Sequence, residues 1–597
     1  MSLPWLPSKV LYVDLTRKRF HVEDRKDLFE KWFGGIGVAI QLYKEETTPG
    51  MDPLSPDNPI IFAIGPLSVI FPMASKTITV FKSPLNGYVA ESHAGGRLAA
   101  AIRFAGYGAV VIKGASDKPL YLVIDERGVK FCDASSLWGM KSTETIGRVL
   151  REVTPGSGFR SIIRTGLAGE RLVRYANVNV DTYRHFGRMG LGAVFGSKKL
   201  KAIVFIGRGS FKLDRKYLAE YMKTYKEIYE MATQSPALKK YHDLGTPQNV
   251  LVLNKLGALP TRNFSSGRFE EAEKISGEYL AEKMLGRRLA CSGCPVACIH
   301  LAALREPTGE PYFYKTTFIS YDYELIYALG SNLGIGDPEG MLKLIRAVEE
   351  YGLDAISTGV VLAWITEAYE KGVVTKNETI VEPKWGDWAT YIKMVEYIVY
   401  QPNEFYKTAA MGVKALAEKY PAGKDFAVHI AGVEPAGYHT GPTYWVSLIV
   451  GFRHSHLDSA GYSYDEKLAK EGKKEVTAHE IAKYVVEEES WRQVLNSMVL
   501  CLFGRGIYKD DVVCKALKSI GIDIDPQKLR EIGRRIWLEK WIVKLREGFD
   551  PEKVEVPKRI LETETPLGKI SPELIAQAIR EIKYMIYEQV EKTIRGA

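Results

Sequence analysis

Hydrophobic and polar residues alternate along the first part of the chain, up to about Gly209, and short turn segments interrupt the alternation. The clearest runs read KVLYVDLTRKRFHV, PIIFAIGPL, KTITVFKSP, YLVIDERGVKFC and KAIVFIG. A period of two is typical of strands that bury one face. The DERG segment at 125–128 lies between two such runs and indicates a hairpin. We therefore expect a β-rich first domain, residues 1–210.

From about Leu213 the spacing of hydrophobic residues becomes helical, and the helices have recognisable caps. The segment DPEGMLKLIRAVEEYG has Asp337 as its N-cap and Gly352 as its stop. The segment TAHEIAKYVVEEESWRQVLNSMVLCLF opens with Thr477 and Glu480 in capping-box spacing. A third segment, SPELIAQAIREIKYMIYEQVEKTI, begins in the same style. The rest of the chain is therefore predicted to be mainly α-helical.

The chain has 597 residues, which is more than one hydrophobic core normally serves. The helical part is long enough for two domains, and we divide it near Lys424 into residues 211–424 and 425–597. The fold class that we predict is α+β, with an N-terminal β-rich domain followed by two mainly α-helical domains.

Composition and charge narrow the class of protein. Hydrophobic residues make up 46% and charged residues 26% of the chain, as in globular proteins. The longest apolar stretch, 60–71, contains Gly65 and Pro66 and is too short to cross a bilayer. The start, MSLPWLPSK, lacks the pattern of a secretory signal, so we expect a cytoplasmic protein without a membrane segment. The net charge of +9 is small for this length, and nucleic-acid binding is not expected.

Three of the six cysteines lie in one short segment, LACSGCPVACIH. Cys291, Cys294 and Cys298 follow the spacing C-x2-C-x3-C, within a segment that Gly293 and Pro295 make turn-forming. Cytoplasmic thiols stay reduced, which favours a metal site over disulfides. Such a turn brings thiolates together around one metal centre, and an iron-sulfur cluster usually needs four of them. We therefore look for a fourth ligand elsewhere in the chain.

The three remaining cysteines differ in their local context. Cys132 lies in a predicted strand and Cys514 on the apolar face of a predicted helix, where cysteine behaves as a small hydrophobic residue. Cys501 ends the predicted helix WRQVLNSMVLC just before a Phe-Gly break, so its side chain can point into a site. We predict Cys501 as the fourth ligand. A zinc site of three cysteines and His300, and three unligated thiols, remain as alternatives.

Several segments resemble, in the same order, the aldehyde:ferredoxin oxidoreductases. They include WFGGIGVAIQLYKEE, SPLNGYVAESHAGG, GRMGLGAVFGSK, CSGCPVAC, YELIYALGSNLGI, YGLDAISTG, LCLFG and IGRRIWLEKW, and the resemblance runs from about 9 to 560. It implies a tungsten bis-pterin cofactor and one 4Fe-4S cluster held by Cys291, Cys294, Cys298 and Cys501. It also implies that the β-rich domain forms a base for the cofactor and that the two helical domains close over it.

The resemblance assigns cofactor contacts to four segments. SHAGG and GRMG look like the loops that hold the pterin phosphates and a bridging magnesium, and glycines there let the backbone approach charged oxygens. The family's D-x-x-G-L-(C/D) motif appears as EEYGLD at 349–354 and as NSMVLC at 496–501. The second copy has Asn and Val where the motif has Asp and Gly, so we expect one pterin to be held differently. The predicted contacts are Lys76, His93, Ala94, Gly95, Gly96, Arg188, Met189, Gly190, Glu349, Leu353, Asp354, Asn496 and Leu500.

The substrate side of the site resembles the family less closely. Glu324 matches the carboxylate that relatives place beside tungsten as a proton acceptor; an ordinary glutamate at a helix start is the alternative. We expect burial to set the pKa of Glu324 near the working pH. His456 is the best match to the family's active-site histidine, with His454 as a rival. GYHTGPTYW and GFRHSHLDSAG replace the corresponding segments of relatives, so the substrate range cannot be inherited.

The function that the resemblance implies is a tungstopterin oxidoreductase, which oxidises a small aldehyde to a carboxylic acid. Electrons would pass through the cluster to ferredoxin or to a small ferredoxin-like subunit. An iron-bridged homodimer is not expected, because Lys343 and Ile392 occupy the positions of its ligands. The alternatives are a different two-electron reaction on the same cofactor, such as reduction of an activated acid or an aromatic ring, and a non-catalytic iron-sulfur electron-transfer subunit.

Overall fold

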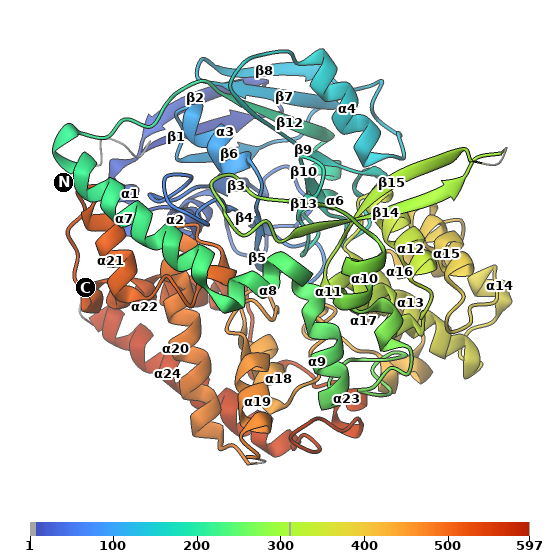
Figure 1. Cartoon of the computed structure of the whole chain (residues 1–597). Coiled ribbons are helices and arrows are strands. Elements are labelled where there is room, and N and C mark those ends of the chain that lie inside the picture. The colour runs from blue at the N-terminus through green and yellow to red at the C-terminus, as the bar shows by residue number, and fades with distance from the viewer. Residues whose placement is uncertain (1–7, 310–311, 474, 596–597) are drawn as a thin grey trace.

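The computed structural model describes residues 8–309, 312–473 and 475–595 (Figure 1). Two six-stranded sheets occupy the upper half of the view and helices from the later part of the chain fill the lower half. This arrangement confirms the predicted α+β class, with the sheets in the N-terminal region.

The first sheet has the strand order β2-β1-β6-β3-β4-β5. β1 pairs with β6 in parallel, and the other neighbours are antiparallel. β2 is exposed throughout and forms one edge, where its charged side chains protect the sheet from further pairing. The strands are β1 (Lys9–Asp14), β2 (Arg19–Asp24), β3 (Ile60–Ala63), β4 (Thr77–Lys82), β5 (Val89–Ala94) and β6 (Ala109–Lys113).

The second sheet has the order β11-β10-β9-β12-β7-β8. The DERG segment forms the predicted hairpin between β7 and β8, with Asp125 opposite Gly128. Helices cover the sheets on both sides, and this explains why every residue of β4 and of β12 is buried. The strands are β7 (Leu120–Asp125), β8 (Gly128–Asp133), β9 (Phe159–Thr165), β10 (Val178–Val180), β11 (Arg184–Phe186) and β12 (Leu200–Gly207).

The two sheets meet at their edges, where β5 of the first lies against β11 of the second. Both strands therefore end beside the same space. Short helices between the strands pack on the sheets and close the N-terminal region: α1 (Lys26–Trp32), α2 (Gly35–Glu46), α3 (Leu98–Phe104), α4 (Thr143–Val153), α5 (Leu167–Glu170) and α6 (Leu191–Ser197).

A third sheet lies within the part that the sequence predicted to be helical. It has three antiparallel strands in the order β13-β14-β15: β13 (Leu285–Leu289), β14 (Ile299–Pro307) and β15 (Tyr314–Tyr321). β14 and β15 form a hairpin that projects from the molecule in Figure 1. Sequence analysis missed this sheet because two of its three strands have few buried residues and no clear alternation.

The three helices with predicted caps are present. α12 (Pro338–Tyr351) has Asp337 as N-cap and Gly352 after its last turn, and α20 (Ala478–Ser497) has the Thr477–Glu480 capping box. The third is α24 (Pro572–Arg595). One boundary was wrong: the predicted helix up to Cys501 ends at Ser497, because Val499 takes a left-handed backbone conformation with φ of 56°.

The remaining α-helices all follow β12 in the chain. They are α7 (Arg215–Gln234), α8 (Pro236–Leu244), α9 (Asn249–Leu256), α10 (Gly277–Lys283), α11 (Tyr323–Leu329), α13 (Ala355–Glu370), α14 (Lys376–Thr379), α15 (Trp388–Tyr400), α16 (Glu404–Ala409), α17 (Val413–Lys419), α18 (Pro442–Val450), α19 (Gly461–Lys470), α21 (Asp510–Lys518), α22 (Pro526–Arg546) and α23 (Lys558–Glu562). Among the described residues, no helix combines the length and the apolar character needed to cross a bilayer.

Candidate active site

A cavity of about 320 Å³ lies where β5 and β11 meet. Its other walls come from the end of β15, the start of α11, the turn between α12 and α13, a loop at 453–462 and the segment that follows α20. Ten predicted site residues line it: Lys76, His93, Gly95, Arg188, Cys298, Glu324, Glu349, Leu353, Asp354 and His456. Segments that are distant in the sequence therefore converge on one space.

Glu324 and His456 face each other in this cavity. Asp322 caps α11 by accepting a hydrogen bond from the Leu325 amide at 3.2 Å, and this places Glu324 in the first helical turn. Glu324 Oε1 accepts a hydrogen bond from the Tyr438 hydroxyl at 2.8 Å and lies 3.1 Å from His456 Nε2. Burial alone would raise the pKa of Glu324, but the bonds from His456 and Tyr438 bring it below its usual value.

The expectation that burial sets the pKa of Glu324 near neutral pH was therefore wrong. The carboxyl group with such a pKa is Asp322, two residues earlier. Asp322 is half-buried, and its loss of contact with water together with the neighbouring charge of Glu324 raises its pKa to about 7. Sequence analysis missed Asp322 because the residue also serves as a helix N-cap, and a capping aspartate is ordinary at that position.

His454 lies away from the cavity. Its Nδ1 is 2.8 Å from the Leu448 carbonyl oxygen, and its Nε2 is 3.2 Å from Lys544 Nζ. Burial and the charge of Lys544 lower the pKa of His454 well below its usual value, so the ring is neutral. Of the two predicted histidines, the geometry thus brings only His456 to Glu324.

A buried ion network fixes the loop that carries His456. Arg453 Nε lies 2.8 Å from Asp458 Oδ1 in the loop and 3.3 Å from Glu91 Oε1 in β5. Lys540 Nζ of α22 is 2.9 Å from the other oxygen of Glu91. Burial would raise the pKa of Glu91, yet the two cations hold it well below its usual value. The network joins the sheet, the loop and α22 at the edge of the cavity.

The four predicted cluster cysteines come together beside the cavity. Burial raises the pKa of Cys294 to about 12, and negative charge on Cys501, Cys291 and Cys298 contributes to that rise. Burial likewise raises the pKa of Cys298 to about 11. For Cys291, the cations of Arg184 and Lys76 outweigh burial and lower the pKa. Such half-buried sulfurs become thiolates when a positively charged metal centre binds them.

Backbone contacts hold two cysteine-bearing segments to the N-terminal region. The Cys501 amide donates to the Met73 carbonyl at 2.9 Å, and the Ser292 amide donates to the Gly96 carbonyl at 3.0 Å. A Cβ added to Gly95 would lie 2.8 Å from Cys291 Sγ. A glycine at position 95 is therefore needed to let this sulfur approach the backbone. This contact explains the glycine without the phosphate contact that the sequence suggested.

The other two cysteines and His300 lie elsewhere. The charged neighbours of Cys514 are Asp510 and Asp511 at the start of its own helix and Asp525, the N-cap of α22. Cys132 bonds to Tyr121 on the neighbouring strand of the second sheet. His300 is buried, with Nε2 2.9 Å from the His242 carbonyl oxygen. Among the described residues, no group of three or more Cys, His, Asp or Glu side chains is arranged to hold a single metal ion.

The first copy of the pterin motif reaches the cavity through both of its acidic residues. Glu349 Oε1 accepts a hydrogen bond from Asn179 Nδ2 at 2.8 Å and lies 2.8 Å from His185 Nε2. Asp354 caps α13 through the amides of Ile356 and Ser357 and also pairs with Arg188 Nε at 3.2 Å. Asp354 therefore has several donors before any cofactor binds.

Six predicted cofactor contacts do not line the cavity: Ala94, Gly96, Met189, Gly190, Asn496 and Leu500. Met189 instead packs in the core and accepts a hydrogen bond from Ser83 at 2.7 Å. Gly190 begins α6 with φ of 82°, and an added Cβ would lie 2.1 Å from the Arg174 carbonyl oxygen. These loops therefore position neighbouring residues, such as Arg188, that do line the cavity.

The donor set of the cavity suits a large anionic cofactor. Within the part of the chain that the structure describes, Arg184 Nε, Arg188 Nη1 and Asn177 Oδ1 are buried without hydrogen-bond partners. Together with Lys76, the two arginines offer donors to phosphate oxygens, while Asn177 Oδ1 can accept a hydrogen bond from a cofactor N–H. Sequence analysis missed Arg184 and Asn177, although Arg184 lies only four residues before the predicted Arg188. The residues present fit a pterin cofactor with phosphate groups.

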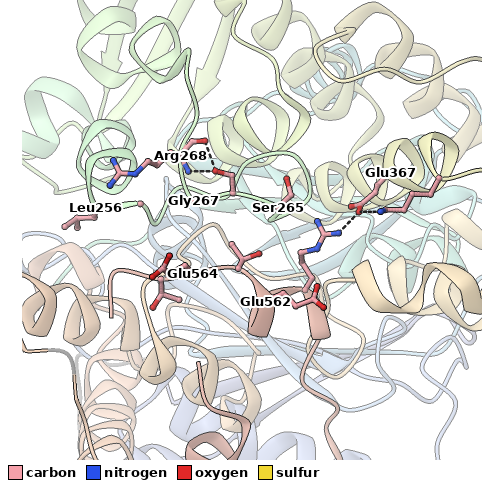
Figure 2. A pocket seen from close by; sticks show the side chains of 13 residues that line it. Leu256, Ser265, Gly267, Arg268, Glu367, Glu562 and Glu564 are labelled. Carbon is pink, nitrogen blue, oxygen red and sulfur yellow. Dashed lines mark hydrogen bonds and ion pairs between the residues drawn. The ribbon is translucent and has the colours of Figure 1, made fainter. Parts of the chain in front are cut away.

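A second, more open pocket of about 680 Å³ lies between α9, the end of α13 and α23 (Figure 2). In this pocket Glu367 pairs with Arg559 and with Lys371. None of the predicted site residues lines this pocket. We therefore assign the chemistry to the smaller cavity.

Comparison with known proteins agrees with this architecture. A search of solved structures finds the active-site complex BamBC of benzoyl coenzyme A reductase with 1,5-dienoyl-CoA, at a TM-score of 0.82, covering 97% of this chain and 94% of that chain. The sequence identity is 20%, so this likeness concerns the fold. The family model for the aldehyde ferredoxin oxidoreductase N-terminal domain matches residues 10–207, and the model for domains 2 and 3 matches residues 223–592.

Curated relatives extend the match over most of the chain. The tungsten-containing aldehyde ferredoxin oxidoreductase of Thermococcus kodakarensis is 34% identical over 94% of this chain and 92% of that protein. Its counterpart from Pyrococcus furiosus is 33% identical over the same shares. Also from Pyrococcus furiosus, an aliphatic sulfonate oxidoreductase, WOR-like subunit, is 32% identical over 71% of this chain and 70% of that protein.

Fold and matches define the class of protein as an oxidoreductase. The chain belongs to the aldehyde ferredoxin oxidoreductase family, whose members use a tungsten pterin. The resemblance that the sequence motifs indicated is confirmed.

Proposed function

We propose that the protein oxidises aldehydes to carboxylic acids. One aldehyde and one water give one acid, two protons and two electrons. The observation that supports this reaction best is the hydrogen-bonded Glu324–His456–Tyr438 group, which lies in one cavity with the predicted pterin contacts. The aldehyde-oxidising relatives at 33–34% identity support the same reaction.

The proposed cofactors are a tungsten bis-pterin, a magnesium ion that bridges its phosphates, and a 4Fe-4S cluster. Lys76, Arg184 and Arg188 would bind the phosphates, and Glu349 and Asp354 would meet the pterin edge. The tungsten pterin supplies the two-electron redox chemistry when it is bound. Cys291, Cys294, Cys298 and Cys501 would hold the cluster.

In this proposal Glu324 accepts the proton that leaves the attacking water or the hydrated aldehyde. Both side-chain donors meet Oε1, so we assign proton acceptance to Oε2. The lowered pKa keeps Glu324 ionised and ready as a base at neutral pH. The pKa of Asp322 is raised, so Asp322 holds a proton more tightly than Glu324 does. In its ionised form Asp322 can therefore accept the proton that Glu324 has taken up.

The electrons would leave one at a time through the cluster. Cys298 lines the cavity, and Leu502 and Phe503 beside Cys501 line it as well, so the proposed cluster is adjacent to the reaction space. Ferredoxin or a small ferredoxin-like subunit is the proposed acceptor. The six cysteines form no disulfide bonds, so the four proposed ligands are available to the cluster.

The experiment that tests the function is anaerobic reduction of a viologen dye by aliphatic, aromatic and sulfonated aldehydes. Replacing the base with glutamine, Glu324→Gln, should lower kcat about 10²–10⁴-fold, since a general base contributes that much. Tungsten and iron contents should stay unchanged. Glu278→Gln is the matched control, because Glu278 is also a first-turn glutamate but is exposed on α10.

Two outcomes would count against the proposal. Full activity of Glu324→Gln would remove Glu324 as the base. A wild-type protein that oxidises no aldehyde of the panel but reduces an aromatic coenzyme A thioester would favour the alternative two-electron reaction.

The pH dependence provides a finer test of the same group. Tyr438→Phe removes a donor to the Glu324 carboxylate, so the pKa of Glu324 should rise. The acidic limb of the kcat/KM profile should therefore move to higher pH by about 0.4–1 unit, the equivalent of one hydrogen bond. A limb that does not move would show that it reports a different group.

A further inference from the structure

Two arginines line the part of the cavity that the proposed reaction does not use. Arg492 extends from α20 and is only 3% exposed. Its Nη1 donates to the Leu457 carbonyl oxygen at 2.7 Å, and its Nε is buried without a hydrogen-bond partner among the described residues. The carboxylate of Glu488 is 3.6 Å from that Nε, and its side chain is 37% exposed. The Nε of Arg492 is thus paired in charge with Glu488, but it makes no hydrogen bond within the described residues.

Arg505 adds a second cation at the same place. Its Nη1 donates to the Leu502 carbonyl oxygen at 2.9 Å. Burial lowers the pKa of Arg492; the charge of Glu488 opposes this effect, and the charge of Arg505 adds to it. Arg492 is buried and Arg505 is half-buried, and the two cations share one partly exposed carboxylate. This leaves an excess of positive charge, and burying unpaired charge is costly. An anion bound between them would remove that cost.

Aromatic rings connect the two arginines with the proposed base. Tyr438, which donates to Glu324, stacks on Tyr462 with ring centroids 4.2 Å apart. Tyr241 and Phe503 form a second stacked pair at 4.3 Å. All four rings line the cavity. They give it flat walls, which favour a planar ligand between the carboxylate end and the arginine end.

We infer that the cavity contains a subsite for an anion, and that the substrate is an aromatic aldehyde with a carboxylate or another oxyanion at its far end. Arg492 and Arg505 bind the oxyanion, and the aldehyde reaches Glu324 and His456. The negative charge of Glu324 repels the oxyanion, so the substrate enters in one orientation. The identity of the reacting group rests on the proposed function; the anion subsite does not.

The kinetic test compares 4-formylbenzoate with neutral 4-methylbenzaldehyde, which has a similar shape. Wild-type kcat/KM should favour the anion by at least about 10-fold, and Arg492→Gln should lower that ratio about 10-fold or more, because a hydrogen bond to a charged group contributes that much. Arg148→Gln, at an exposed arginine of α4, should keep the wild-type ratio.

4-Formylbenzenesulfonate distinguishes a carboxylate-specific subsite from a general oxyanion subsite. Equal kcat/KM for the charged and neutral aldehydes would overturn the inference.

A binding measurement keeps the inference testable without turnover. Calorimetry on the purified holoenzyme should show 4-methylbenzoate binding at least about 10-fold more tightly than neutral 4-methylbenzamide, and Arg492→Gln should abolish the difference. If no aldehyde is oxidised but this preference is present, the proposed function fails and the subsite stands. If Arg492→Gln loses tungsten or pterin, the arginine holds the cofactor and the inference is wrong.

Discussion

The helices α12 and α20 end in two separate turns of the same type. The side chains of the two turns are assigned to different cofactors. After α12, the amides of Gly352 and Leu353 donate back to Glu349 and Val348. After α20, the amides of Val499 and Leu500 donate back to Asn496 and Leu495 in the same pattern. Gly352 and Val499 both have left-handed backbones, with φ of 75° and 56°. This is the common way to end a helix with a left-handed residue.

Each turn also bonds to a segment of the N-terminal region in the same way. Gly352 accepts from the Asn177 amide at 2.8 Å, and two residues later the Asp354 amide donates to Tyr175 at 2.9 Å. Correspondingly, Val499 accepts from the Lys76 amide at 3.2 Å, and the Cys501 amide donates to Met73 at 2.9 Å. The structure therefore uses one local design twice to place a side chain beside the cavity.

The difference lies in what each turn presents. The first turn has Glu349 and Asp354 in the cavity wall, and we assign both to the pterin. In the second turn Asn496 is 2% exposed and does not line the cavity, and the last position is Cys501. The backbone of each turn therefore sets where the side chain lies, and the type of side chain determines which cofactor it can bind.

The largest expected effect is on metal content, because substitutions in the two turns should remove different metals. Cys501→Ala should reduce iron from about four atoms per chain to fewer than about one, because a 4Fe-4S cluster needs four thiolates. Asp354→Asn should retain the iron and lower the tungsten content. Cys514→Ala is the matched control and should leave both metals unchanged. Four irons in Cys501→Ala, measured by elemental analysis, would contradict the assignment of the second turn.

A smaller effect concerns the tolerance of the first turn for a side chain. A Cβ at Gly352 would lie 2.9 Å from the backbone of Gly166, so Gly352→Val combines backbone strain with a clash. The melting temperature should fall by about 2–4 °C for a chain of this length. Gly372→Val is the control, because Gly372 has φ of 69° and open space around its Cβ position. It should lower the melting temperature by less than about 1 °C; equal losses in the two variants would rule out the clash.

The smallest effect concerns the valine in the second turn. A β-branched residue in the left-handed region is strained, yet Val499 is fully buried in a cluster with Phe452 and Ile536, and that packing offsets the strain. Val499→Gly should change the melting temperature by less than about 1 °C. Val499→Ala retains the strain but loses methyl groups, so it should be less stable than the glycine variant. The reverse order would show that Val499 is not strained.

Helix caps and breaks are set by residues close together in the sequence, and such features were predicted correctly. The caps Asp337 and Thr477 marked their helices correctly, and the break after α20 pointed to Cys501 although the helix ends earlier. Gly95 was recognised, but its reason, the approach of the Cys291 sulfur, depends on a contact across almost two hundred positions.

The rest of the site depends on distant partners that no local pattern reveals. Sequence motifs did not separate His454 from His456, because the choice depends on Lys544 of α22 and on Glu324 of α11. Arg184 and Arg492 were missed for the same reason: their importance is visible only once burial leaves a donor without a partner.

In our proposal the turn after α20 brings Cys501 to the three other cysteines around an iron-sulfur cluster. The iron, sulfide, tungsten and zinc content of the protein purified without oxygen, together with the EPR spectrum of its reduced form, decides whether this cluster is present. We expect about four irons, about four sulfides and about one tungsten per chain, with the signal of a reduced 4Fe-4S cluster. Zinc without iron or sulfide would rule the cluster out.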